Sequence, residues 1–223
     1  AGRARVRLTA WYELEEQVGR WWHRWAASAP SYPEHPDAEI RFDSLRDTLA
    51  VYFRAMGGER SLALVTAAAQ ASGHRLTLRQ RLGLEGEPME RARRDADNLV
   101  LPSRLALFPE YSLNRDLYFW LAAFLAEVRQ LSVPADPLQR DLLEIAEAAR
   151  AGETLCTRFP GLAERYRRLC KGLLEIRPER ALPPVEADVE ALIRDSLGQS
   201  DALSAPGELI QRIGAGEVLT RLA

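Results

Sequence analysis

Apolar residues recur every three or four positions in six segments of the chain, and this spacing predicts a mainly α-helical protein. The predicted helices cover residues 9–27, 44–56, 113–130, 138–150, 162–176 and 186–197. Glycine or proline follows several of them, such as Gly57-Gly58, Gly152 and Pro178, as is typical of helix ends. A proline-rich connection, residues 28–37, joins the first two helices, which we interpret as an αα-hairpin.

The pattern changes between about residues 60 and 106, where short apolar runs alternate with turn-type stretches. In RLTLRQRL (75–82) leucines alternate with arginine and threonine, which predicts strands with one wet face. The alanine-rich run 61–69 fits a helix equally well. We therefore predict an α+β, mainly α-helical fold: a helical bundle with a small antiparallel β-sheet inserted at about residues 60–106. Residues 1–180 would form the main domain, and 181–223 a helical extension leading to a linker.

Composition and charge narrow the class of protein. The 223 residues carry a formal net charge of -2 with a pI near 6.0, so no general basic field attracts nucleic acid. Two cysteines, Cys156 and Cys170, cannot make a four-ligand zinc site alone, and we interpret them as reduced thiols of a cytoplasmic protein. No signal peptide is evident. The missing initial methionine and the uncapped final helical run suggest a piece of a longer protein.

Motifs for known catalytic chemistry are missing from the sequence. It contains no phosphate-binding GxxxxGK[ST], no GxSxG and no HExxH motif, and its three histidines lie in separate segments. The densest basic run that we singled out, RARRD (91–95), fits a solvated strand face better than a nucleic-acid site. We predict a non-enzymatic chain with no cofactor and no metal site. An enzyme with an unrecognised carboxylate site is the less favoured alternative.

The aromatic run LFPEYSLNRDLYFWLAAFL (107–125) cannot span a membrane, because charged residues interrupt it. Its apolar stretch is shorter than the roughly 20 apolar residues that a spanning helix needs. Apolar residues surround most of its helix, so we predict burial on nearly all sides. Asn114 is expected to cap the N-terminus of the helix, with Asp116 in its first turn. The four tryptophans of the first helix are interpreted as core residues, apart from one at a partner surface.

Three stretches resemble the NorD/CbbO family, which includes the nitric-oxide reductase activation protein and a Rubisco activase subunit. They are LEEQVGRWWHRW, SLRDTLAVYFRAMGG and LPSRLALFPEYSLNRDLYFWLAA, and the resemblance spans about residues 11–130. The family resembles a two-part co-chaperone with a C-terminal von Willebrand A domain that carries a metal site. This chain, which lacks the D-x-S-x-S motif of that site, would be the N-terminal region.

The resemblance implies a function by contact. The expected partner is a MoxR-type AAA+ ATPase hexamer, NorQ or CbbQ, and the expected target is nitric-oxide reductase or Rubisco, which the sequence does not separate. No membrane insertion and no nucleic-acid partner are expected. A stand-alone helical regulatory or scaffold protein is the main alternative. The candidate partner-binding residues are Arg91, Arg93, Arg94, Trp22 and Arg115.

Overall fold

The computed structural model describes residues 33–66, 92–94, 97–129, 137–177, 179, 181–182 and 184–198. The chain divides into two units, Ala1–Glu127 and Val128–Ala223. The predicted first helix with its tryptophans and the RLTLRQRL strands lie outside the described residues, so the αα-hairpin stays a prediction. The predicted domain boundary near residue 180 stays a prediction.

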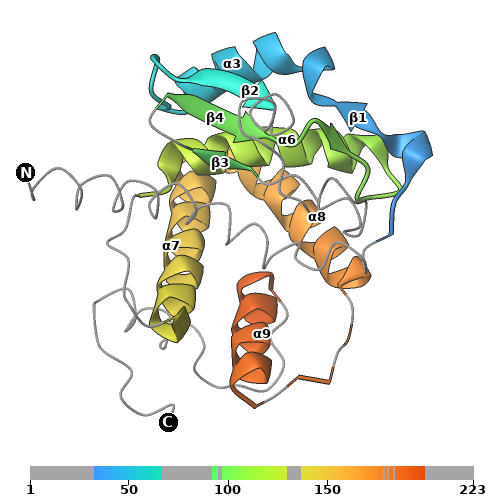
Figure 1. Cartoon of the computed structure of the whole chain (residues 1–223), viewed down its shortest axis with the longest axis vertical. Coiled ribbons are helices and arrows are strands. Elements are labelled where there is room, and N and C mark those ends of the chain that lie inside the picture. Colours follow the sequence, from blue (N-terminus) through green and yellow to red (C-terminus); the bar gives the residue numbers. More distant parts are fainter. Residues whose placement is uncertain are drawn as a thin grey trace, which may run out of the picture. The chain divides into compact units, whose positions relative to one another are not determined.

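The first unit is built around one buried helix, α6 (Tyr111–Glu127). Every residue from Asp116 to Leu125 is buried, because nearly all positions of this stretch are apolar and helix α3 (Arg46–Ala55) and several strands pack against it (Figure 1). Leu49 and Phe53 are the fully buried contacts of α3. The predicted burial of this helix on nearly all sides is confirmed.

Helix α3 ends where predicted, and the ending depends on two glycines. Gly57 has a φ of 102°, a left-handed conformation that side chains disfavour. Gly58 lies against the Phe53 ring so closely that a Cβ atom would stand 2.4 Å from it. The chain then turns back into the first strand of a sheet.

Two small sheets complete the first unit. One has the order β2-β4-β3 and consists of β2 (Ala63–Thr66), β4 (Asn98–Leu101) and β3 (Arg93–Arg94). The other pairs β1 (Ile40–Arg41) with β5 (Arg104–Leu105) in antiparallel fashion. The α+β, mainly helical class is confirmed, but the three-stranded sheet is mixed. Strand β2 runs parallel to β4, with Leu64 opposite Leu99, whereas β3 pairs antiparallel. A parallel pair needs a long crossover, which the more than 30 residues between the two strands supply.

Asn114 plays a different part from the predicted one. Helix α6 begins at Tyr111, so Asn114 lies within its first turn and does not precede it. Its side chain is fully buried and makes three hydrogen bonds. Oδ1 accepts from the Phe108 N–H at 2.9 Å, while Nδ2 donates to the carbonyls of Phe108 at 2.8 Å and Ala38 at 2.9 Å. The predicted cap was therefore wrong: Asn114 holds the incoming loop and a segment 76 positions earlier against the helix.

The second unit consists of three helices, α7 (Pro137–Arg158), α8 (Pro160–Ile176) and α9 (Pro184–Ser196). Only Phe159 separates α7 from α8, and Pro160 occupies the first turn of α8, where its missing N–H costs nothing. Leu192 of α9 packs with Leu142 and Ala146 of α7. The apolar stripes of the predicted helices make these contacts.

The prediction that Gly152 ends a helix was wrong, because α7 continues through it to Arg158. It is buried beside α8, and a Cβ atom there would lie 3.5 Å from the Tyr166 hydroxyl. A glycine in a helix interior costs about 1 kcal/mol relative to alanine, which helix packing can offset. No helix of the described residues is long and apolar enough to cross a membrane.

We predict that Asn114→Ala lowers the free energy of unfolding by about 2–4 kcal/mol, because it removes three buried hydrogen bonds at once. Urea unfolding followed by circular dichroism measures the change. Ser112→Ala, at an exposed position of the same helix, is the control and should change stability by less than about 0.5 kcal/mol. Equal effects of the two substitutions would contradict this role of Asn114.

Candidate partner-binding surface

An aromatic strip that includes an arginine lies at the N-terminal end of α6. Tyr111, Arg115 and Phe119 follow one another at intervals of four residues, so they share one face of the helix. The Arg115 guanidinium lies over the Phe119 ring, 5.2 Å from its centre, and the Tyr52 ring of α3 meets Phe119 edge-on at 5.0 Å. We call these four residues the aromatic strip.

The aromatic strip has exposed side chains that rest on a buried ring. Tyr111 is 52% exposed and Arg115 is exposed, whereas Phe119 beneath the guanidinium is 6% exposed. A cation held over a ring keeps its planar donors oriented at small entropic cost. Tyrosine and arginine are also the residues that most often anchor protein interfaces. Among the predicted site residues that the structure describes, Arg93, Arg94 and Arg115, the last is the one held in the open over a ring.

The other predicted site residues are placed differently. Arg93 and Arg94 lie on β3, beside β4 in the three-stranded sheet. Arg94 donates through Nη2 to Glu59 at 3.1 Å, and its side chain is 23% exposed. Its charge is therefore already engaged in an ion pair within the first unit. Arg91 and Trp22 lie outside the described residues.

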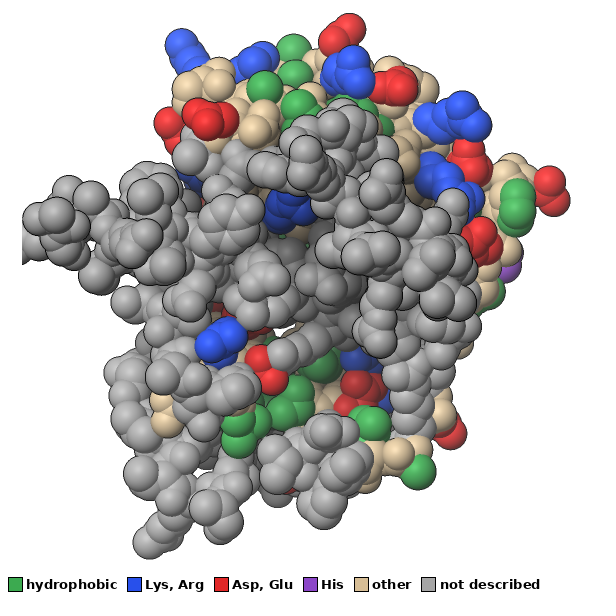
Figure 2. Space-filling view, viewed as in Figure 1, with side chains coloured by type: hydrophobic (Ala, Val, Ile, Leu, Met, Phe, Trp, Pro, Cys, Tyr) green, Lys and Arg blue, Asp and Glu red, His purple; other side chains and the backbone are tan. Residues whose placement is uncertain are grey.

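The sequence prediction missed two exposed apolar residues of the first unit. Tyr111 was taken as part of the loop before the helix, and Val51, which is 67% exposed, lies next to Tyr52 on α3. Once the helix is known to start at residue 111, the four-residue spacing places Tyr111 on the same side as the exposed Arg115. Figure 2 shows that hydrophobic side chains alternate with arginines and carboxylates along the edge that holds α3 and β1.

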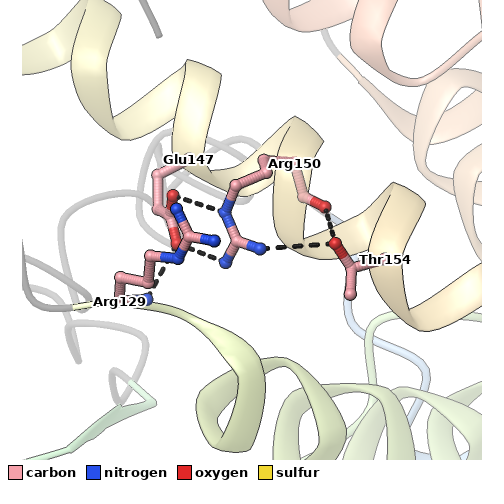
Figure 3. Close-up of polar contacts among 4 residues, drawn as sticks. All are labelled: Arg129, Glu147, Arg150 and Thr154. Atoms are coloured by element: carbon pink, nitrogen blue, oxygen red, sulfur yellow. Dashed lines mark hydrogen bonds and ion pairs between the residues drawn. The ribbon is translucent and has the colours of Figure 1, made fainter. Parts of the chain in front are cut away.

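A buried carboxylate group organises the start of the second unit. Glu147 of α7 is 7% exposed and accepts hydrogen bonds from the Arg150 Nε at 2.7 Å and Nη2 at 2.6 Å (Figure 3). The same carboxylate accepts from the backbone N–H of Arg129 at 2.8 Å. Arg150 in turn reaches the Thr154 hydroxyl at 3.3 Å. These bonds hold the backbone at Arg129 against α7, so we interpret Glu147 as a structural residue.

A second ion-pair group joins the end of α8 to α9. Arg177, with a side chain only 6% exposed, contacts both oxygens of Glu190 at 2.6 and 2.7 Å, and Arg194 contacts one of them at 2.9 Å. Burial raises the pKa of Glu190, but the hydrogen bonds and charges of Arg177 and Arg194 outweigh it, and its pKa is lowered overall. This carboxylate is therefore saturated by its partners and is unsuited to proton transfer.

The two cysteines are free, as predicted, and neither has the properties of a nucleophile. Burial raises the pKa of Cys170 to about 12, against a smaller lowering by a hydrogen bond with Tyr166. Burial also raises the pKa of Cys156, which the charge of Arg167 partly offsets. Because the thiolate is the reactive and metal-binding form, both side chains are poor ligands at neutral pH. In the described part of the chain, no three His, Cys, Asp or Glu side chains group as metal ligands would.

Sequence comparisons add relatives to this picture. No family model matches the chain, and no solved structure gives a significant match. A protein named NorD from Brucella abortus is 42% identical over 189 residues, 84% of this chain. A NorD from Stutzerimonas stutzeri is 35% identical over 193 residues, 86% of the chain, and an uncharacterised protein from Pseudomonas aeruginosa is 34% identical over 188 residues, 84% of the chain.

The chain spans about 30% of the length of these relatives. It is an α+β protein of mainly helical structure, whose exposed aromatic strip fits contact with a partner. The similarities support the NorD family, to which the sequence motifs pointed, for the 84% of the chain that they cover.

We predict that the Arg177–Glu190–Arg194 group makes the second unit sensitive to acid. Because the folded-state pKa of Glu190 is lowered from 4.5, its stabilisation is fully present above that pH and is lost as the pH falls through the lower folded value. Glu190→Gln should reduce stability at pH 7 by roughly 3 kcal/mol, since it leaves the buried Arg177 without its charged partner. It should also flatten the pH dependence of thermal unfolding below about pH 4.5. Glu175→Gln, which changes an exposed carboxylate, is the control. An unchanged pH profile in the Glu190 variant would contradict the prediction.

Proposed function

We propose that this chain is a non-catalytic adaptor module that couples a MoxR-type AAA+ ATPase hexamer to the activation of a target enzyme. The observation that carries the proposal is the 42% identity with a NorD protein over 84% of the chain. The residues that carry the family motifs in the described part of the chain also build the core of the first unit. Among them, Asn114, Leu117, Tyr118 and Trp120 are buried in α6.

The chemistry of the described residues supports a role by contact. The buried Glu147 and the partly buried Glu190 are engaged by arginines, and the thiols have raised pKa values. His35, the histidine in the described residues, lies in the loop before β1, where its backbone N–H donates to Ala106. A stand-alone regulatory or scaffold protein shares these features and differs only in having no ATPase partner.

The name NorD borne by the relatives favours nitric-oxide reductase over Rubisco as the target. In this proposal the target is gripped by a von Willebrand A domain beyond the region described here, while this chain contacts the hexamer. Arg115 and Tyr111 of the aromatic strip are the anchors that we assign to that contact, because both are exposed and the arginine lies over Phe119, whose ring in turn meets Tyr52. The hexamer would then act on the first unit, whose central helix α6 is buried on nearly all sides.

The first test is binding and ATPase activity. The chain, immobilised through an affinity tag, should retain a MoxR-type hexamer of the NorQ class and change its ATPase rate several-fold, because contact with the ring alters the population of its active state. An unrelated AAA+ hexamer is the control. If the chain neither retains the NorQ-class ring nor changes its rate, the scaffold alternative replaces this proposal.

The second test concerns the aromatic strip. Arg115→Ala should weaken binding of the hexamer roughly tenfold or more, as expected for an interface anchor. It should lower stability by no more than about 1 kcal/mol, since an exposed cation–π contact contributes about that much. Arg54→Ala, which removes an exposed arginine from α3, is the matched control and should bind normally. Equal affinities of the two variants would remove Arg115 from the interface.

A further inference from the structure

The exposed side of α8 carries mostly positive charge. Between residues 154 and 174 the sequence holds five cations and a single acid, Glu164, although the whole chain has a net charge of -2. The cations are Arg158, Arg165, Arg167, Arg168 and Lys171, and all five are exposed. The prediction from sequence attended to RARRD and passed over this longer basic stretch.

Packing fixes which way these cations face. The opposite side of α8 is buried through Leu162, Leu169, Cys170 and Leu173, and Tyr166 reaches Gly152 of α7. Residues 165, 168 and 171 therefore repeat along one exposed side of a helix that cannot rotate without unburying its leucines. We call Arg165, Arg168 and Lys171, with Arg167 beside them, the α8 basic face.

Two acids of the same helix frame this face. Glu164 pairs with Arg167 at 2.5 Å, and Glu175 approaches Lys171 at 3.9 Å. Both pairs are mostly exposed, so each contributes little to stability. They limit the rotamers of Arg167 and Lys171 and leave the helix surface positive overall. Exposed cations gathered on one side of a helix create a local positive potential that attracts acidic groups of a partner.

We propose that the α8 basic face binds an acidic segment of a partner protein, in which Asp or Glu residues recur every three or four positions. Cations at positions 165, 168 and 171 match carboxylates at helical spacing, and arginine forks bind carboxylates in bidentate fashion. This proposal goes beyond the coupling role above, because it rests on α8 alone and names one kind of occupant, an acidic segment with helical spacing.

The charge pattern favours a protein partner over nucleic acid. A nucleic-acid duplex presents phosphates along its whole length and is bound best by extended basic surfaces. Here Glu164 and Glu175 close both ends of the face, and the chain outside residues 154–174 is acidic overall. A short acidic segment fits between the two glutamates and avoids repulsion by the rest of the chain.

The test uses a fluorescent helical peptide of about 20 residues with a short acidic centre, in which Glu recurs every three or four positions and the flanks are uncharged. Fluorescence anisotropy should show binding that weakens as salt rises, and the same peptide with Gln in place of Glu should not bind. The triple variant Arg165→Gln, Arg168→Gln and Lys171→Gln should lose roughly tenfold or more in affinity.

A matched control removes the same net charge elsewhere. The triple variant Arg41→Gln, Arg46→Gln and Arg54→Gln changes three exposed arginines of the first unit and should bind the peptide as the unchanged chain does. Thermal unfolding of both variants establishes that they are folded. No binding of the Glu peptide, equal losses in the two variants, or tighter binding of duplex DNA through the α8 basic face would overturn the proposal. None of these results bears on binding of the ATPase, which Arg115 tests separately.

Discussion

The first unit depends on the buried amide of Asn114. The Asn114 side chain accepts a hydrogen bond from Phe108, donates one back to it and donates another to Ala38. A single residue therefore joins the central helix to the loop before it and to the segment before β1. Buried polar groups are costly unless every donor and acceptor is matched, and here both ends of the amide are matched. This arrangement sets where α6 begins, and thereby places Tyr111 and Arg115 on its exposed side.

The buried and exposed sides of α6 therefore have separate roles. The buried side supplies stability through Leu117, Tyr118 and Trp120, and the Tyr118 hydroxyl donates to the Pro102 carbonyl at 2.8 Å. The exposed side holds an arginine over an aromatic ring that itself rests on α3. A partner that binds there would contact the buried central helix of the unit. Such a surface suits an adaptor that has to transmit force without deforming.

The sequence predicted what depends on local spacing. The helices α3, α6, α8 and α9 were found within a few residues of their bounds, because each carries a strong apolar repeat. The parallel pairing of β2 with β4 was missed, since it joins segments more than 30 residues apart and leaves no local mark. Asn114 was misread because asparagine favours helix caps, whereas the helix begins at Tyr111 and the amide bonds Phe108 and Ala38. Gly152 was misread because its neighbour on α8 cannot be seen in the pattern. Among the candidate site residues, Arg115 gained a defined geometry from Phe119, whereas Arg94 turned out to pair with Glu59.

The central claim is that this chain contacts an AAA+ hexamer through the exposed side of α6. Site-specific photo-crosslinking tests it most directly, with a photoreactive amino acid placed at Tyr111 and, as a comparison, at the exposed Pro160 of α8. The account predicts a crosslink from position 111 to a NorQ-class hexamer and none from position 160. A hexamer that binds the chain but crosslinks only from position 160, or from neither, would contradict it.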